Sequence, residues 1–363
     1  MNALERIARE RLARQHLLRP APLEPAAVVS ALGAMQAQDY HGAKWALGQR
    51  IRGGTDAGVE RAFDAGAILR THVLRPTWHF VTPADIRWML ALTGPRVSRA
   101  MAYYNRILEL TLEVFRRSNA ALVRALRGGR HLTRAELAVA LRRAGVGRVE
   151  GQRLGHLMMQ AELEGVVCSG PRRGKQFTYA LLDERVPERA RPLPKDAALR
   201  ALARRYFATR GPATARDLAW WSGLPIREAL RAADLLGRAV ERETIDGEAY
   251  FSIDRPAAVR VRAPRALLLP NYDEYFIGLK DRRAIGQRLA RLPRRLPADA
   301  TFAHVLVIDG QLVGDWRRAD VRGRAAVRLR ILAPLTRGEQ GAVDAAVERY
   351  GAFLGAAVTV HRV

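Results

Sequence analysis

The sequence has little cysteine and no long apolar run. Its single cysteine, Cys168, excludes a framework of internal disulfides and gives no cysteine cluster for a metal ion. No stretch approaches the roughly 18 consecutive apolar residues of a membrane-spanning helix, and the N-terminus lacks the apolar segment of a signal peptide. We therefore expect a soluble, cytoplasmic protein.

Negative charge and lysine are also scarce. The 363 residues include 61 Lys and Arg against 36 Asp and Glu, which gives a formal net charge of +25 at pH 7. Only four basic residues are lysine: Lys44, Lys175, Lys195 and Lys280. A GC-rich genome explains the use of arginine in place of lysine, but it does not explain the shortage of acids. So large an excess of positive charge favours a nucleic-acid partner.

Residues 111–182 predict three helices followed by a β-hairpin. Thr133 and Glu136 have the spacing of a capping box at the start of the second helix. Apolar residues at a spacing of three to four predict the third helix, and strands at 166–168 and 176–181 flank a basic turn. This order is typical of a winged helix. The tip of its hairpin, where a wing meets phosphates, carries Arg172, Arg173 and Lys175.

The same order recurs in residues 196–253. A helix ends at Gly211-Pro212, Thr214 precedes the next helix as a cap, and Pro225 suits the first position of the third. The following hairpin closes on Asp246-Gly247, a strong two-residue turn signal. Two copies of one uncommon order predict tandem winged helices.

The remaining segments are less regular. The first 110 residues predict a looser third copy, with helices near 3–18, 25–36 and 58–64 and strands at 67–72 and 77–81. The C-terminal part predicts strands at 266–270, 302–308, 311–316 and 356–360 and a helix near 338–354. We therefore expect an α+β fold, mainly α, with winged-helix modules at 1–110, 111–190 and 191–257 and an α/β segment at 258–363.

Two glutamines, Gln36 and Gln38, follow a helical apolar stripe that predicts a helix ending near Gln36. Within a helix, residues two apart face nearly opposite directions, whereas in an extended segment they share a face. Their amides could then converge on a water, a sugar oxygen or a base edge. The spacing equally allows one glutamine to cap the helix while the other is solvated.

Candidate aromatic and histidine side chains follow at residues 75–80. In a strand, Thr77 and His79 face one side, while Trp78 and Phe80 face the other. Trp78 or His79 could line a nucleotide pocket by stacking or hydrogen bonding, or they could belong to an apolar core strand. The same two interpretations hold for His41 and His72.

Three carboxylates are candidates for direct chemistry: Asp39, Asp273 and Glu274. Each could act as a general base on water or pair with one of the many arginines. The sequence has no histidine pair with metal-ligand spacing, no glycine-rich phosphate loop and no convincing nucleophile motif. We therefore expect no metal ion and no cofactor.

A second basic ribbon lies in the hairpin expected between residues 305 and 331. Alternate residues of a strand share a face, so its arginines could enter a groove of DNA or remain a solvated surface. They are Arg317, Arg318, Arg322, Arg324, Arg328 and Arg330.

Three motifs, in this order across a winged-helix frame, make the chain resemble the AlkZ/YcaQ-like DNA glycosylases over nearly all its length. They are Met35-Gln36-Ala37-Gln38, Leu74-Arg75-Pro76-Thr77-Trp78-His79-Phe80 and Leu269-Pro270-Asn271-Tyr272-Asp273-Glu274-Tyr275. The resemblance implies a monomeric base-excision enzyme that binds double-stranded DNA with three winged helices, acts near the nucleoid and not at a membrane, and removes N7-alkylated purines or unhooks interstrand crosslinks. It assigns catalysis to Gln36 and Gln38, although the residue between them is only an alanine.

The chemistry fits this resemblance. N7 alkylation makes guanine cationic and a good leaving group, so the protein need only place a water and stabilise an oxocarbenium-like transition state. We therefore expect a monofunctional DNA glycosylase that leaves an abasic site. The alternatives are a non-enzymatic DNA-binding regulator, although no dimerisation helix is obvious, and a protein whose winged helices bind another protein.

Overall fold

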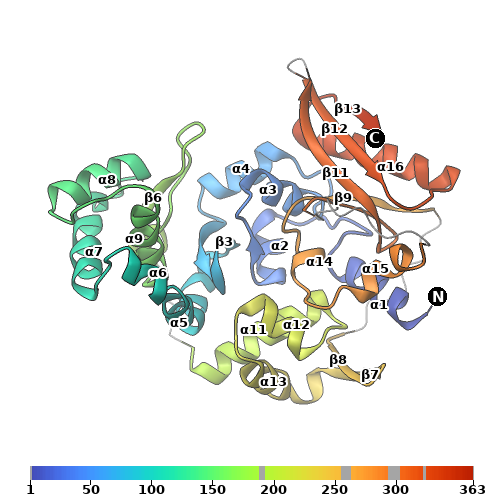
Figure 1. Cartoon of the computed structure of the whole chain (residues 1–363), viewed down its shortest axis with the longest axis horizontal. Coiled ribbons are helices and arrows are strands. Elements are labelled where there is room, and N and C mark those ends of the chain that lie inside the picture. The colour runs from blue at the N-terminus through green and yellow to red at the C-terminus, as the bar shows by residue number, and fades with distance from the viewer. Residues whose placement is uncertain (1, 188–192, 255–262, 293–302, 322–323, 363) are drawn as a thin grey trace.

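The computed structural model describes residues 2–187, 193–254, 263–292, 303–321 and 324–362. It contains helices and strands in a mixed arrangement. Figure 1 shows the N-terminal elements in blue at the centre, with a green helical unit to one side, a yellow unit below and a red sheet at the opposite edge. The N-terminal elements therefore lie among the three other segments.

The N-terminal segment forms a small antiparallel sheet in the order β1-β3-β2. The prediction of a helix reaching Gln36 is wrong, because α2 ends at Leu32. Gly33 follows with φ +80°, a left-handed conformation that stops the helix, and Gln36 instead pairs with His79 across two strands. The elements are α1 (Ala3–Arg14), α2 (Pro25–Leu32), β1 (Met35–Gln36), α3 (Tyr40–Gly48), α4 (Asp56–Asp64), β2 (Leu69–Val73), β3 (Arg75–Val81), α5 (Pro83–Ala100) and α6 (Ala102–Ile107).

The first helical unit, which we define as residues 112–181, has the predicted helices and hairpin. The capping box between Thr133 and Glu136 is confirmed, while the short strand β4 was not predicted. Its three strands have the order β4-β6-β5. The elements are α7 (Leu112–Leu126), β4 (Leu132–Thr133), α8 (Arg134–Arg143), α9 (Gly151–Leu163), β5 (Val167–Ser169) and β6 (Thr178–Leu181), with α10 (Leu182–Arg185) directly after them.

The second helical unit, residues 195–252, repeats this order. The turn predicted at Asp246-Gly247 is confirmed, since both residues have positive φ values, of 50° and 78°. Thr214 forms a capping box with Asp217 at the start of α12. The elements are α11 (Lys195–Arg210), α12 (Ala215–Ser222), α13 (Ile226–Asp234), the 3-10 helix η1 (Gly237–Ala239), β7 (Glu241–Ile245) and β8 (Glu248–Ser252).

The C-terminal segment is a five-stranded sheet in the order β13-β12-β11-β10-β9. Only the β12–β13 pair is parallel, and α16 packs against β9. The short helix α14 follows β9 and brings its acidic residues towards the N-terminal segment. The elements are β9 (Ala266–Leu269), α14 (Glu274–Ile277), α15 (Arg283–Ala290), β10 (Val305–Ile308), β11 (Gln311–Val321), β12 (Arg324–Ile331), α16 (Arg337–Leu354) and β13 (Thr359–Arg362).

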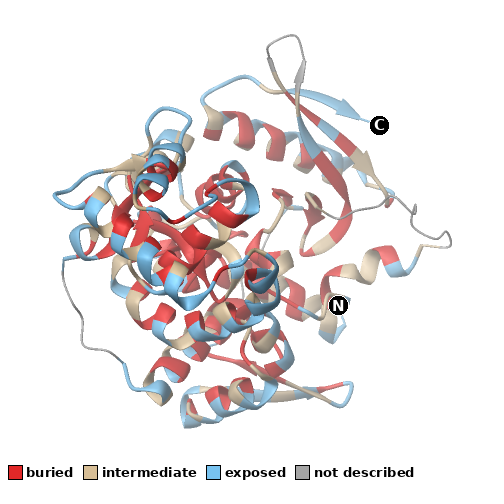
Figure 2. Cartoon of the chain, turned by 60° about the vertical axis from the view of Figure 1, so that its left-hand side comes forward, coloured by how far each residue is buried: buried red, intermediate tan, exposed pale blue. Residues whose placement is uncertain are grey.

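The β1-β3-β2 sheet takes part in two hydrophobic cores. Met35, Ala37 and Phe80 belong to a core shared with the C-terminal sheet, whereas Val73 and Val81 belong to one shared with the second unit. The first unit has a core of its own, and Figure 2 shows buried residues concentrated where the elements face one another. The strand that carries Gln36 is thus held from two sides. The boundaries predicted near residues 190 and 257 fall on or beside residues outside the described part of the chain.

Candidate functional site

Gln36 and Gln38 both lie against β3. Gln36 is opposite His79 in the strand register, and the N–H of Ala37 donates to the Trp78 carbonyl at 2.7 Å. Ala37 faces the core, so Gln36 lies on the other face, with His79. Gln36 is buried, whereas Gln38 is exposed and its Oε1 lies 3.4 Å from the Trp78 amide nitrogen. The structure therefore brings the two amides to one strand, one held inside and the other at the surface.

The side chain and the backbone of Gln36 are both fixed. Arg75 Nη2 donates to Gln36 Oε1 at 2.8 Å, and the Gln36 N–H donates to Glu274 Oε1 at 2.7 Å. The other oxygen of Glu274 accepts from Arg210 at 2.6 Å and from the Trp221 indole at 2.9 Å. Arg210 and Glu274 are fully buried. Glu274 therefore holds β1 in place and forms a buried ion pair with Arg210.

The other two candidate carboxylates also have structural contacts. Asp273 receives two hydrogen bonds from Arg50, each 2.8 Å long, and both side chains are fully buried. Asp39 accepts from the Gly42 N–H at 3.1 Å and caps α3. The alternative interpretation of the sequence, ion pairing with an arginine, describes Asp273; the role of Asp39 as a helix cap was not among the predictions.

His79 is a buried neutral histidine. Its Nδ1 lies 2.9 Å from the Thr77 carbonyl oxygen, which only accepts, so Nδ1 carries the proton. Burial, aided by the nearby Arg75 charge, holds the pKa of His79 well below its ordinary value. Its Nε2, with Thr77 Oγ1 and Arg75 Nε, is among the buried atoms that have no partner within the described residues. Unpaired polar atoms of β3 therefore lie close to Gln36.

On the opposite face of β3, arginines and aromatic rings alternate. The Arg70 guanidinium lies 4.2 Å from the Trp78 ring and 4.6 Å from that of Phe177. Arg172 in turn lies 4.8 Å from Phe177 and 5.0 Å from Tyr40. We call these five residues the guanidinium–aromatic stack. Arg70 also donates to the Ala37 carbonyl at 3.0 Å, and burial lowers the pKa of Arg70 to about 10. The stack therefore joins the hairpin of the first unit to the backbone between the glutamines.

A second contact joins the first unit to the same strands. Glu162, buried in α9, bonds to His72 Nδ1 and accepts from the indole of Trp78 at 3.4 Å. Residue 162 gave no signal in the sequence beyond being an acid in an apolar helix. Its role depends on contacts more than 80 residues away, which no local pattern shows.

The candidate DNA-binding residues divide into buried and exposed ones. Arg172, expected at the tip of the wing, has a side chain only 9% exposed and lies 3.6 Å from Glu60 of α4. Arg173 is exposed but paired with Glu136, and Lys175 is exposed. Arg317, Arg318 and Arg328 of the C-terminal sheet are exposed, as is His41, which was predicted as a catalytic or pocket residue. Arg330 pairs with Asp315, Arg324 begins β12, and Arg322 lies outside the described residues.

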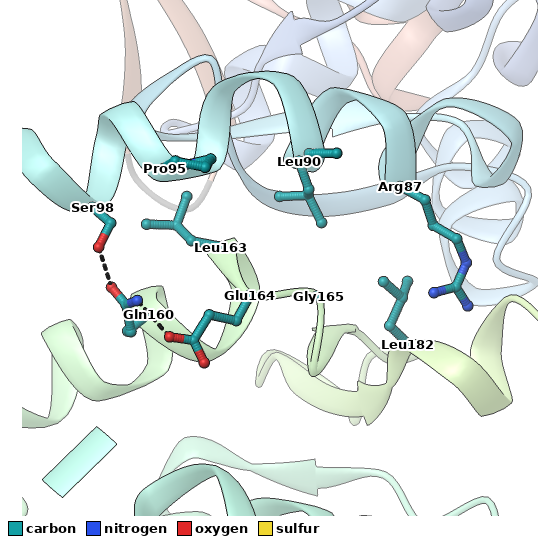
Figure 3. A pocket seen from close by; sticks show the side chains of 11 residues that line it. Arg87, Leu90, Pro95, Ser98, Gln160, Leu163, Glu164, Gly165 and Leu182 are labelled. Carbon is teal, nitrogen blue, oxygen red and sulfur yellow. Dashed lines mark hydrogen bonds between the residues drawn. The ribbon is translucent and has the colours of Figure 1, made fainter. Parts of the chain in front are cut away.

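A cavity of about 450 Å³ lies between α5 and α9, as Figure 3 shows. Its polar groups bond to one another: Ser98 donates to Gln160, which donates to Glu164. Neither glutamine of the Gln36 motif lines it. Among the described residues, no group of three or more His, Cys, Asp or Glu side chains could hold a metal ion, and no described helix is long and apolar enough to cross a membrane.

Comparisons with known proteins agree with one another. The family model for the DNA glycosylase AlkZ-like proteins matches residues 29–353. An interstrand DNA cross-link repair glycosylase of Streptomyces sahachiroi is 26% identical over 314 residues, which cover 81% of this chain and 82% of the relative. The solved structure of the Streptomyces sahachiroi DNA glycosylase AlkZ superposes with a TM-score of 0.80 at 21% identity, over 100% of both chains. At that identity the superposition shows a common mixed helical and β fold.

Proposed function

Since the chain belongs to the AlkZ-like DNA glycosylase family, we propose that it hydrolyses the N-glycosidic bond of N7-alkylated purines in duplex DNA and leaves an abasic site. The observation that carries this proposal is the placement of Gln36 and Gln38 against β3, with Gln36 fixed on both its side chain and its backbone. Because the similar Streptomyces protein is named for interstrand cross-link repair, crosslinked purines are a second substrate to test.

The reaction needs positioning more than strong acid or base. An N7-alkylated purine carries positive charge, so the electron pair of the C1′–N9 bond passes readily into its ring as that bond breaks. The water oxygen forms the new bond to C1′, and its proton passes to solvent. Neutral amides suit this task, since they orient a water beside an oxocarbenium-like sugar without adding charge. An unmodified purine is a poorer leaving group and is spared.

We interpret both helical units, and more loosely the N-terminal segment, as winged helices that cradle duplex DNA, with module ranges of 1–110, 111–190 and 191–257. We further propose that the protein acts as a monomer, in the cytoplasm and on the DNA of the nucleoid. The exposed residues Arg173, Lys175, Arg317 and Arg318 are proposed to contact the phosphate backbone, so binding should weaken steeply as salt rises.

A duplex with one N7-methylguanine tests the proposal. The protein is incubated with it, alkali is added, and strand cleavage at the resulting abasic site is measured on a gel. We expect cleavage well above spontaneous depurination, and its loss in the double variant Gln36→Ala/Gln38→Ala with DNA affinity retained. An interstrand-crosslinked duplex is tried next. If wild-type protein binds both duplexes but cleaves neither, the enzyme proposal is wrong and the non-enzymatic regulator is favoured.

A further inference from the structure

The contact between Arg75 and Gln36 decides which way the Gln36 amide points. A guanidinium carries only donors, so the atom that faces Arg75 Nη2 at 2.8 Å must be the amide oxygen. The Gln36 backbone cannot turn away, because its N–H is bonded to the buried Glu274 carboxylate. Since the oxygen and nitrogen of an amide point in different directions, the atom turned away from Arg75 is the amide nitrogen, Nε2, which carries two protons.

We propose that Gln36 acts in the reaction only as a hydrogen-bond donor, that Arg75 is the positioning residue that enforces this, and that Gln38 supplies the acceptor. This inference rests on the proposed glycosylase function and assigns unequal roles to the two glutamines. Within the described part of the chain, no acceptor bonds to Gln36 Nε2, so both of its protons are available.

The backbone around Arg75 is shaped to keep its guanidinium in place. Leu74 adopts φ 63°, a left-handed conformation that costs a leucine energy and persists only where its surroundings impose it. Its N–H is held by the Thr93 hydroxyl at 3.0 Å. Gly223, between α12 and α13, lies so close that a Cβ there would overlap the Leu74 carbonyl oxygen. The turn of the second unit thus fixes the bend from which Arg75 reaches Gln36.

Gln38 differs from Gln36 in every one of these respects. It is exposed, and among the described residues its side chain has one hydrogen bond, which Oε1 accepts from the Trp78 N–H at 3.4 Å. A hydrogen bond of that length is weak, so Oε1 can exchange it for a proton of a bound water. The water oxygen would accept from Gln36 Nε2 while one of its protons is held by Gln38.

The division of roles matches the reaction. The charge on Arg75 polarises the Gln36 amide and strengthens its N–H as a donor. A water held in this way keeps a lone pair for C1′, and one of its protons already points to Gln38. As the C1′–O bond forms and the C1′–N9 bond breaks, the electron pair enters the cationic purine and the water proton leaves to solvent by way of the Gln38 side.

Two isosteric variants, Gln36→Glu and Gln38→Glu, test the inference. Each replaces one amide of the motif by a carboxylate, so the two variants have the same net charge and differ in which glutamine is changed. Gln36→Glu pairs with Arg75 but has no N–H, and we expect its single-turnover rate on N7-methylguanine duplex to fall about 100-fold or more, the typical cost of one lost catalytic donor. Gln38→Glu keeps its acceptor oxygen, and its rate should stay within about 10-fold of wild type, measured at saturating protein so that affinity does not enter.

Arg75 is tested by a double-mutant cycle with Gln36→Glu. Arg75→Met should lower the wild-type rate at least 10-fold at unchanged substrate affinity, Arg75→Lys should recover part of it, and Arg75→Met should cost nothing further in the Gln36→Glu background. Melting curves identify variants that fail to fold. Equal losses of rate in Gln36→Glu and Gln38→Glu would overturn the inference, as would additive losses of rate in the double-mutant cycle. In either case, cleavage by the wild-type protein would still support the glycosylase function. A wild-type protein that cleaves nothing overturns the proposed function itself.

Discussion

The two helical units share one order of elements but use different parts to contact the β1-β3-β2 sheet and Glu274, which binds that sheet. The first unit presents its third helix and its hairpin: Glu162 of α9 bonds to His72, and Phe177 and Arg172 enter the guanidinium–aromatic stack. The second unit presents its first two helices: Arg210 ends α11, Trp221 lies in α12, and both bond to Glu274.

The third helix of each unit also differs in how far it is exposed to solvent. In the second unit, α13 turns Ile226 and Leu230 to solvent, with 46% and 47% of their surfaces exposed. In the first, the corresponding α9 is buried over its last turns and packs on α5 and β2. Figure 1 shows the first unit and the second unit on different sides of β3. A shared local pattern therefore does not fix which surface is free to meet DNA, because tertiary contacts decide it.

Loss of the buried ion pair between Glu274 and Arg210 of the second unit should have the largest effect on stability. Glu274→Gln removes the charge opposite the buried Arg210, and leaving one partner of a buried ion pair costs about 3–5 kcal/mol of unfolding free energy. Chemical denaturation of the full chain measures this. Glu113→Gln, in the exposed pair with Arg116, is the matched control and should change the value by less than about 0.5 kcal/mol. Equal effects of the two variants would show that the Glu274 contact does not hold β1.

Two basic residues of the first unit's hairpin should have different roles: Arg172 should stabilise the fold, and Lys175 should contact DNA. Arg172→Met removes a cation between two rings, so we expect a loss of about 1 kcal/mol in stability with an unchanged salt dependence of DNA binding. Lys175→Met should leave stability unchanged and reduce the slope of log affinity against log salt by about one, as for a lost phosphate contact. Denaturation and salt titrations measure both. The reverse pattern would mean that Arg172 turns outward to DNA.

The pH dependence of stability should report on His79, in the strand that both units contact. Its pKa in the folded protein lies well below the ordinary 6.5, so the unfolded chain binds the extra proton. The stabilisation is complete above pH 6.5 and is lost as the pH falls towards the folded pKa, at about 1.4 kcal/mol per pH unit. His79→Asn, compared with wild type between pH 7.5 and 5.5, should remove this slope. Parallel curves would mean that His79 is not held neutral.

The sequence predicts what depends on neighbouring residues. The capping box at Thr133 and the turn at Asp246-Gly247 need only a few consecutive side chains, and both form as expected. The end of α2 was misplaced because a helical apolar stripe continues past Gly33, whose left-handed φ is not visible in the pattern. The bonds of Arg75 to Gln36 and of Glu162 to Trp78 span 39 and 84 residues, so only the folded chain shows that Gln36 and Gln38 differ.

The most direct measurement of the central claim is release of the modified base. Wild-type protein in excess over a duplex with a single N7-methylguanine is quenched over time, and free base is quantified by chromatography with mass detection. The account predicts free N7-methylguanine and an abasic strand in equal amounts, formed far faster than spontaneous loss and abolished by Gln36→Ala/Gln38→Ala. Base release at the spontaneous rate from both this duplex and a crosslinked one, with the protein bound, would contradict it.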